Sequence, residues 1–147
     1  MSDMQELLTQ AAEEVLENMF FSGVMGEMTD EPAGERLCAT VAFSGSSQGQ
    51  LGVSTPASTA AVLAAGFLGV EVEVDGAVPD AQVRAVVGEL ANVLCGVILG
   101  RLSPEGNFVI SPPDITETEG VGAIHGMELH RCFELMEGEL AVGLTVH

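Results

Sequence analysis

The chain has 147 residues, 47% of them hydrophobic, and is therefore large enough to form one domain with a buried core. Its formal net charge is −18, from 22 acidic residues against four arginines and no lysine. Nucleic acids and anionic membranes require basic surfaces, so this composition argues against both as partners and favours a protein or a small molecule.

Three cysteines, Cys38, Cys95 and Cys132, form no CxxC pair and leave one thiol unpaired under any disulfide scheme. We therefore expect them to be small core residues in a reducing cytoplasm. The N-terminal residues show no basic region followed by an apolar run, and no segment reaches ~18 uninterrupted apolar residues. Both features predict a cytoplasmic protein that is neither secreted nor membrane-spanning.

The first third of the chain predicts a helix followed by a hairpin. Apolar residues at helical spacing predict an amphipathic helix over residues 3–20. Residues 25–35 mix Gly, Met, Pro and acidic residues, which predicts an exposed connection. Residues 36–44 and 50–55 are rich in Val, Leu, Ala and Thr, and the Gly- and Ser-containing loop at 45–49 predicts that they form an antiparallel pair.

A second, shorter helix should follow the hairpin. Thr55 and Pro56 fit an N-cap and a first helical position, and the helix should stop near Gly69. Residues 70–76 alternate between apolar and acidic side chains and are bounded by glycines. This pattern allows either a strand or an extended linker.

Residues 80–102 predict one long helix with two unlike sides. An apolar side should face the core: Val83, Val86, Val87, Leu90, Leu94, Val97 and Ile98. The opposite side carries what we call the small-residue strip: Ala85, Glu89, Asn92, Gly96 and Gly100. Because a helical glycine costs up to ~1 kcal/mol relative to alanine, two glycines on the strip indicate that another surface approaches it closely.

The last third of the chain is predicted to consist of strands. Residues 107–111 begin a strand that runs into two prolines, which cannot sit in a central ladder. Residues 127–135 and 139–146 flank a short turn and predict a second hairpin. The order of helices and hairpins does not repeat as βαβ, so we expect a single α+β domain over residues 1–147, with helices packed on a largely antiparallel sheet.

Glu89 and Asn92 are the strongest candidates for chemistry. They lie three positions apart on one face of the long helix, and the small residues around them allow a partner to reach the carboxamide. An asparagine side chain offers one acceptor and two donors in a plane, which suits it to hold a water molecule without becoming charged. Glu89 offers an ion pair to a lysine of the partner.

This pattern resembles the CheC/CheX/FliY family of bacterial chemotaxis phosphatases. The family signature places Glu, two residues and then Asn on a helix, followed at some distance by Pro, and the matching positions here are Glu89, Asn92 and Ser111-Pro112-Pro113, with Gly120 beyond. The N-terminal helix, with residues 13–21, and the paired C-terminal strands are similar to the CheX-like branch. The resemblance covers most of the chain and implies a CheC/CheX-like fold.

The chain also departs from the family pattern. The family often has Asp or Ser four residues before the Glu, where this chain has Ala85. The N-terminal helix carries Glu14 and Asn18 but no Glu-x-x-Asn, so we expect no second, CheC-like active site.

The resemblance implies hydrolysis of the aspartyl phosphate on a CheY-like receiver domain. Asn92 would orient a water, Glu89 would pair with the receiver's phosphate-site lysine, and Ala85, Gly96 and Gly100 would contact the receiver. The Mg²⁺ would belong to the receiver, so we expect no cofactor of the chain's own. Arg84 and Arg101, at the two ends of the helix, would offset the acidity of the receiver's phosphorylation site.

One other function and an oligomeric state remain open within the resemblance. The chain could be a non-catalytic adaptor of the same fold that binds a receiver or a flagellar-switch component. The family also implies a homodimer formed through strand exchange, with which an apolar C-terminal strand is compatible.

The remaining motifs favour simpler interpretations. His125, His130, Cys132 and His147 lack metal-ligand spacing, so we expect no metal site. The Gly-rich residues 120–126 lack the lysine of a phosphate loop, and no Gly-x-Ser-x-Gly elbow supports a Ser-His-Asp hydrolase. A small-molecule sensor has no positive support.

Overall fold

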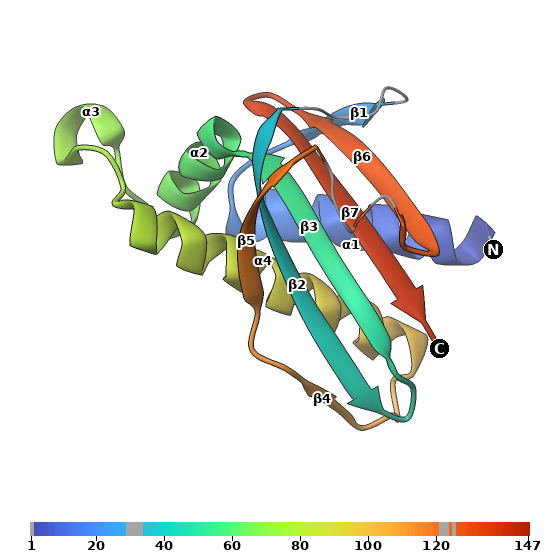
Figure 1. The fold of residues 1–147 in the computed structure, drawn as a ribbon. Helices are drawn as coiled ribbons and strands as arrows, with labels where there is room; N and C mark the ends of the chain where they lie inside the picture. Colours follow the sequence, from blue (N-terminus) through green and yellow to red (C-terminus); the bar gives the residue numbers. More distant parts are fainter. Residues whose placement is uncertain (1, 29–33, 121–123, 125) are drawn as a thin grey trace.

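A seven-stranded antiparallel sheet forms the centre of the fold in the computed structural model, which describes residues 2–28, 34–120, 124 and 126–147. The strand order is β1-β6-β7-β3-β2-β4, and β5 also pairs with β2. The three long helices cover one face of the sheet (Figure 1). The helices are α1 (Ser2–Met19), α2 (Ala57–Leu68), α3 (Val72–Asp75) and α4 (Asp80–Leu102). The strands are β1 (Val24–Met28), β2 (Glu35–Gly45), β3 (Gly49–Pro56), β4 (Phe108–Ile110), β5 (Asp114–Glu119), β6 (Leu129–Leu135) and β7 (Gly138–Val146).

The main core lies between this sheet and α4. Alternate residues of β3 and β7, such as Leu51, Val53 and Val142, point to the helical side because side chains of a strand alternate between its faces. They meet the predicted apolar side of α4, whose members are buried except for the half-buried Val97. By length and composition α4 could cross a membrane, but its buried apolar side makes it the core helix of this fold.

The predicted α+β class, both hairpins and the long helix are confirmed. One prediction at the edge of the sheet is wrong, and a second edge strand was not predicted. Residues 25–28, expected in an exposed connection, belong to β1, which pairs with β6. Residues 114–119 form β5 against β2. Both are mostly exposed edge strands, so neither carries the apolar alternation that identifies a half-buried strand.

Two local predictions between β3 and α4 are also wrong. Thr55 does not cap α2, because its Oγ1 donates a hydrogen bond to the Glu139 carbonyl at 2.8 Å, and Pro56 occupies the N-cap position. Residues 72–75 form the short helix α3, neither a strand nor an extended linker. Gly69 and Gly76 flank this segment with positive φ values of 70° and 88°, which glycine adopts readily.

Candidate functional site

The small-residue strip lies on the exposed side of α4, as predicted. Ala85, Glu89, Gly96 and Gly100 are exposed and Asn92 is half-buried, while Leu90 and Leu94 on the opposite side are fully buried. A Cβ added at Gly96 or Gly100 would meet no atom within 4 Å, so both positions open directly to solvent. The strip is therefore free of bulk along about four helical turns.

Glu89 and Asn92 have free polar groups. Among the residues that the structure describes, neither side chain forms a hydrogen bond or an ion pair. Two polar side chains three positions apart on one helix face point in nearly the same direction. Their carboxylate and carboxamide are thus available together to an approaching molecule.

The segment between β4 and β5 borders one side of the strip. Gly88 is buried, and a Cβ at this position would lie 2.9 Å from Pro113 Cγ and 3.1 Å from Ile115 Cδ1. Residues four positions apart stack along a helix, so this contact lies one turn below Asn92. The absence of a side chain at Gly88 lets Pro113 pack directly on α4, and Pro113 thereby borders the site.

The C-terminal part of α2 borders the other side. A shallow depression of about 310 Å³ lies between the two helices and is lined by Phe67, Leu68, Gln82, Ala85, Val86 and Glu89. Its lining is mostly apolar apart from Gln82 and Glu89. Glu89 therefore lies at the edge of an apolar surface. A partner could bury apolar surface in this depression while one of its basic groups pairs with the Glu89 carboxylate.

Both arginines of α4 already have acidic partners. Arg84 pairs with Glu117 of β5 at 2.7 Å, and Arg101 pairs with Glu14 of α1. Each arginine is thus neutralised locally, and the expectation that they offset the acidity of a partner is not supported by this geometry. Glu14 forms this ion pair with α4 and so does not combine with Asn18 on α1.

No metal cluster occurs in the described part of the chain. Within residues 2–28, 34–120, 124 and 126–147, no three His, Cys, Asp or Glu side chains lie close enough to hold an ion. His130 and Cys132 do share one face of β6, but His125 and most of the Gly-rich stretch at 120–126 lie outside the described residues.

The three cysteines are buried and unpaired, as predicted for core residues. Burial raises the pKa of Cys95 and of Cys132 to about 11, and it also raises the pKa of Cys38. A raised pKa keeps a thiol neutral and poorly nucleophilic near neutral pH. These cysteines therefore offer no nucleophile for covalent catalysis.

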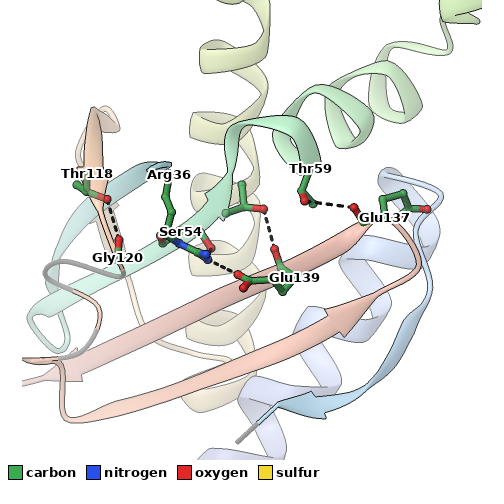
Figure 2. A network of polar contacts seen from close by, with 8 residues as sticks. Arg36, Ser54, Thr59, Thr118, Gly120, Glu137 and Glu139 are labelled. Carbon is green, nitrogen blue, oxygen red and sulfur yellow. Dashed lines mark hydrogen bonds and ion pairs between the residues drawn. The ribbon is translucent and has the colours of Figure 1, made fainter. Parts of the chain in front are cut away.

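A buried ion pair on the other face of the sheet was not predicted from the sequence. Figure 2 shows the Arg36 side chain reaching across β3 toward β7, where its Nη2 lies 2.5 Å from Glu139 Oε1. Arg36 Nε donates to Ser54 Oγ at 2.8 Å and Nη2 to the Ser54 carbonyl at 2.9 Å. Ser54, Ala141 and Gly143 lie on this face of the sheet. Their small side chains are the signal in the sequence that other residues pack on this face. This pair lies on the opposite face of the sheet from α4 and ties β2, β3 and β7 together.

The fold and the strip together define a class of protein: a sheet-and-helix domain whose central helix presents a Glu-x-x-Asn pair bordered by a proline segment. The sequence model of the family described as "Chemotaxis phosphatase CheX" matches residues 37–131, which is more than half of the chain and includes Glu89, Asn92 and Pro113. The chain belongs to this family. A comparison with curated protein sequences finds no significant match.

Solved structures of the family share the fold along nearly the whole chain. The chemotaxis protein CheX of Vibrio vulnificus is 15% identical, with a TM-score of 0.76 over 98% of this chain and 96% of that one. CheX of Desulfovibrio desulfuricans is 17% identical, with a TM-score of 0.72 over 99% of both chains. A third, 17% identical, is the CheX of Borrelia burgdorferi, solved as a complex with CheY, BeF3 and Mg²⁺, with a TM-score of 0.68 over 97% of both chains. At these identities the likeness establishes the fold.

Proposed function

We propose that this protein hydrolyses the aspartyl phosphate of a CheY-like receiver domain in chemotaxis or a related two-component signal. The observation that carries the proposal is the pair of free polar side chains, Glu89 and Asn92, on a strip cleared of bulk. Membership of the chemotaxis phosphatase family supports it, and so does the existence of a related CheX in complex with CheY.

Asn92 would position the attacking water. Its carboxamide can accept one hydrogen bond from the water and donate another to the phosphoryl group, and it stays uncharged throughout. The water oxygen then forms the new bond to phosphorus while the bond to the aspartyl oxygen breaks, which releases inorganic phosphate and restores the carboxylate. Phosphoryl transfer depends mainly on such positioning and on charge stabilisation, so one well-placed carboxamide can suffice.

Glu89 would dock the receiver. Its carboxylate has no partner in the described chain and would pair with the lysine of the receiver's phosphate site. Ala85, Gly96 and Gly100 provide the clearance that brings Asn92 close to the phosphoryl group. Mg²⁺ would be held by the receiver, since Glu89 is the only carboxylate on the strip, and the chain would need no cofactor.

The alternative is a non-catalytic adaptor that binds a receiver or a flagellar-switch component through the same strip. Ala85 favours it, because the family often carries Asp or Ser at this position. In either role we expect a cytoplasmic protein. A homodimer also stays a prediction. Within this chain β7 is paired on both sides, by β3 and β6, and the edges of the sheet are at β1 and at β4 and β5.

Turnover separates the two roles. A purified receiver labelled on its aspartate with ³²P is mixed with catalytic amounts of the chain, and the loss of label is followed over time. The phosphatase proposal expects loss that is faster than the receiver's own decay and proportional to the amount of chain added. Tight binding of the phosphorylated receiver with no acceleration would assign the adaptor role.

A further inference from the structure

A second apolar surface lies on the side of α2 that faces away from the small-residue strip. A groove of about 500 Å³ runs between the end of α1, the helix α2 and residues 70–73. Its floor is apolar and includes Phe20 and Leu63, which are almost completely buried. Its walls carry three exposed apolar side chains, Phe21, Val62 and Val72, with 75%, 46% and 46% of their surfaces accessible.

Phe21 is held in an unfavourable backbone conformation. Its φ is 54°, and no other non-glycine residue in the described part of the chain has a positive φ. The Ser22 N–H donates to the Leu16 carbonyl at 2.9 Å, which closes the turn that forces this conformation at the end of α1. Glycine is the residue best suited to such a position. Phenylalanine in this conformation lowers the stability of the fold, and its side chain is exposed. Packing within the chain therefore does not explain why a phenylalanine occupies this position.

The floor of the groove is preformed. The Phe20 ring stacks on Phe67 with a centroid distance of 4.9 Å, and a Cβ at Gly66 would lie 2.4 Å from the Phe20 carbonyl oxygen. These contacts fix the end of α1 against α2. A ligand entering the groove would therefore meet a rigid apolar surface, which lowers the entropic cost of binding.

The rim of the groove is acidic. Glu71, Glu73 and Glu137 line it, and Ser22 Oγ donates to Glu137 Oε1 at 2.6 Å, which fixes that carboxylate at the rim. None of the described residues that line the groove is an arginine. Each of the four arginines pairs with a glutamate elsewhere: Arg36 with Glu139, Arg84 with Glu117, Arg101 with Glu14 and Arg131 with Glu27.

We propose that this groove binds an amphipathic segment of a partner protein that carries basic residues beside its apolar face. The apolar face would fill the groove with Phe21 as the anchor, and the basic residues would pair with Glu71, Glu73 and Glu137. The groove contains none of the residues of the small-residue strip. The proposal of a binding groove is therefore independent of the proposed phosphatase activity.

The test uses a defined probe and one substitution with opposite expected effects on stability and binding. The probe is a fluorescein-labelled synthetic helical peptide with leucines on one face and lysines beside them, and its anisotropy is followed during titration with the full chain. Phe21→Gly should weaken binding more than about tenfold, because aromatic anchors carry much of an interface's affinity. The same substitution should leave the melting temperature unchanged or higher, because glycine relieves the positive φ.

A matched pair of charge variants separates the rim from the general acidity of the chain. Glu71→Gln with Glu73→Gln should weaken binding more than Glu6→Gln with Glu13→Gln, which removes the same charge from exposed positions on α1. Asn92→Ala should bind the peptide like the parent. Equal losses in the two charge pairs, or peptide affinity unaffected by Phe21→Gly, would overturn the proposal.

Two other occupants have their own signatures. If the chain sediments as a dimer that Phe21→Gly dissociates, a second copy fills the groove and the proposal fails. If Phe21→Gly raises KM for the phosphorylated receiver but does not change the affinity for the peptide, the receiver itself fills the groove, and the proposal fails in that case too.

Discussion

Arg36 is completely buried, whereas Arg84, Arg101 and Arg131 are all partly exposed. Removing the carboxylate of Glu139 would leave its guanidinium buried with only Ser54 as a partner. We expect Glu139→Gln to lower the free energy of unfolding by about 3 kcal/mol, the lower end for a broken buried pair, because Glu139 keeps some exposure. Urea denaturation measures this loss.

The control is Glu117→Gln, which breaks the exposed pair with Arg84. It should cost no more than about 1 kcal/mol, because exposed ion pairs contribute little. Equal losses of stability in the two variants would show that the buried pair of Arg36 and Glu139 stabilises the fold no more than an exposed ion pair does.

The buried thiols predict a loss of stability at alkaline pH. The pKa of Cys95 is raised from 9.0 to about 11, so this thiol stays protonated in the folded chain while it ionises in the unfolded chain. The contribution of the Cys95 thiol to the free energy of unfolding is complete below pH 9. It is lost as the pH rises to about 11, at about 1.4 kcal/mol per pH unit in that window. Urea midpoints measured from pH 8 to 11 should fall more steeply in the parent than in Cys95→Ala. Parallel curves would refute this origin of the alkaline loss.

At the residue scale the sequence predicts exposed features better than buried polar ones. The helical positions of Glu89, Asn92, Gly96 and Gly100 follow from a period of 3.6 residues. Glu89 and the two glycines are exposed as expected, and Asn92 is half-buried. The pairing of Arg36 with Glu139 joins strands separated by about 100 positions in the chain. Nothing in the local sequence of either residue indicates this pairing.

The helix α4 offers two glycines whose substitution should have opposite effects. Gly96→Ala meets no atom, so it should raise the free energy of unfolding by up to about 1 kcal/mol through helix propensity alone. Gly88→Ala should lower it by about 1–3 kcal/mol, because the new Cβ would press on Pro113 and Ile115. Thermal denaturation of the two variants provides the comparison.

Activity adds a second readout for Gly96. If the strip contacts the receiver, Gly96→Ala should be more stable than the parent yet slower in releasing phosphate, because the methyl group reduces the clearance. A variant that is both more stable and fully active would show that the receiver does not approach this part of α4.

At the scale of elements, the strongly periodic segments were predictable and the edge strands were not. The long helix carries six turns of consistent apolar spacing, and its bounds agree with the prediction. The strand β5 has one apolar residue in six, Ile115, and most of its other side chains are exposed. Short helices such as α3 depend on local hydrogen bonds, here from the Glu71 N–H to Asp75 Oδ2, which periodicity does not reveal.

The charge of the whole molecule predicts salt dependence. All four arginines are paired with glutamates, and with 22 acidic residues in the chain most of the negative charges have no basic side chain to offset them and repel one another. Raising NaCl from 20 to 500 mM should screen this repulsion and raise the melting temperature by about 3–6 °C. Replacing the exposed Glu6, Glu13 and Glu17 with glutamine should reduce this dependence. A melting temperature that falls with salt would show that ion pairs outweigh the repulsion.

For the whole molecule, the sequence predicts the fold class and the family, because the order of helices and hairpins and the Glu-x-x-Asn pair occur together. It does not predict how Pro113 and α2 border the strip on its two sides. That arrangement depends on contacts between segments about 25 and 20 positions away in the chain, at Gly88 and in the depression beside Phe67.

The most direct test of the central claim is the rate at which a phosphorylated CheY-like receiver loses phosphate with the Asn92→Ala variant. Because Asn92 is proposed to position the water, this variant should lose at least about 100-fold of the acceleration, while its free energy of unfolding changes by no more than about 0.5 kcal/mol. Asn18→Ala, the same change at an exposed asparagine of α1, should match the parent. An Asn92→Ala protein that is folded and fully active would contradict the account.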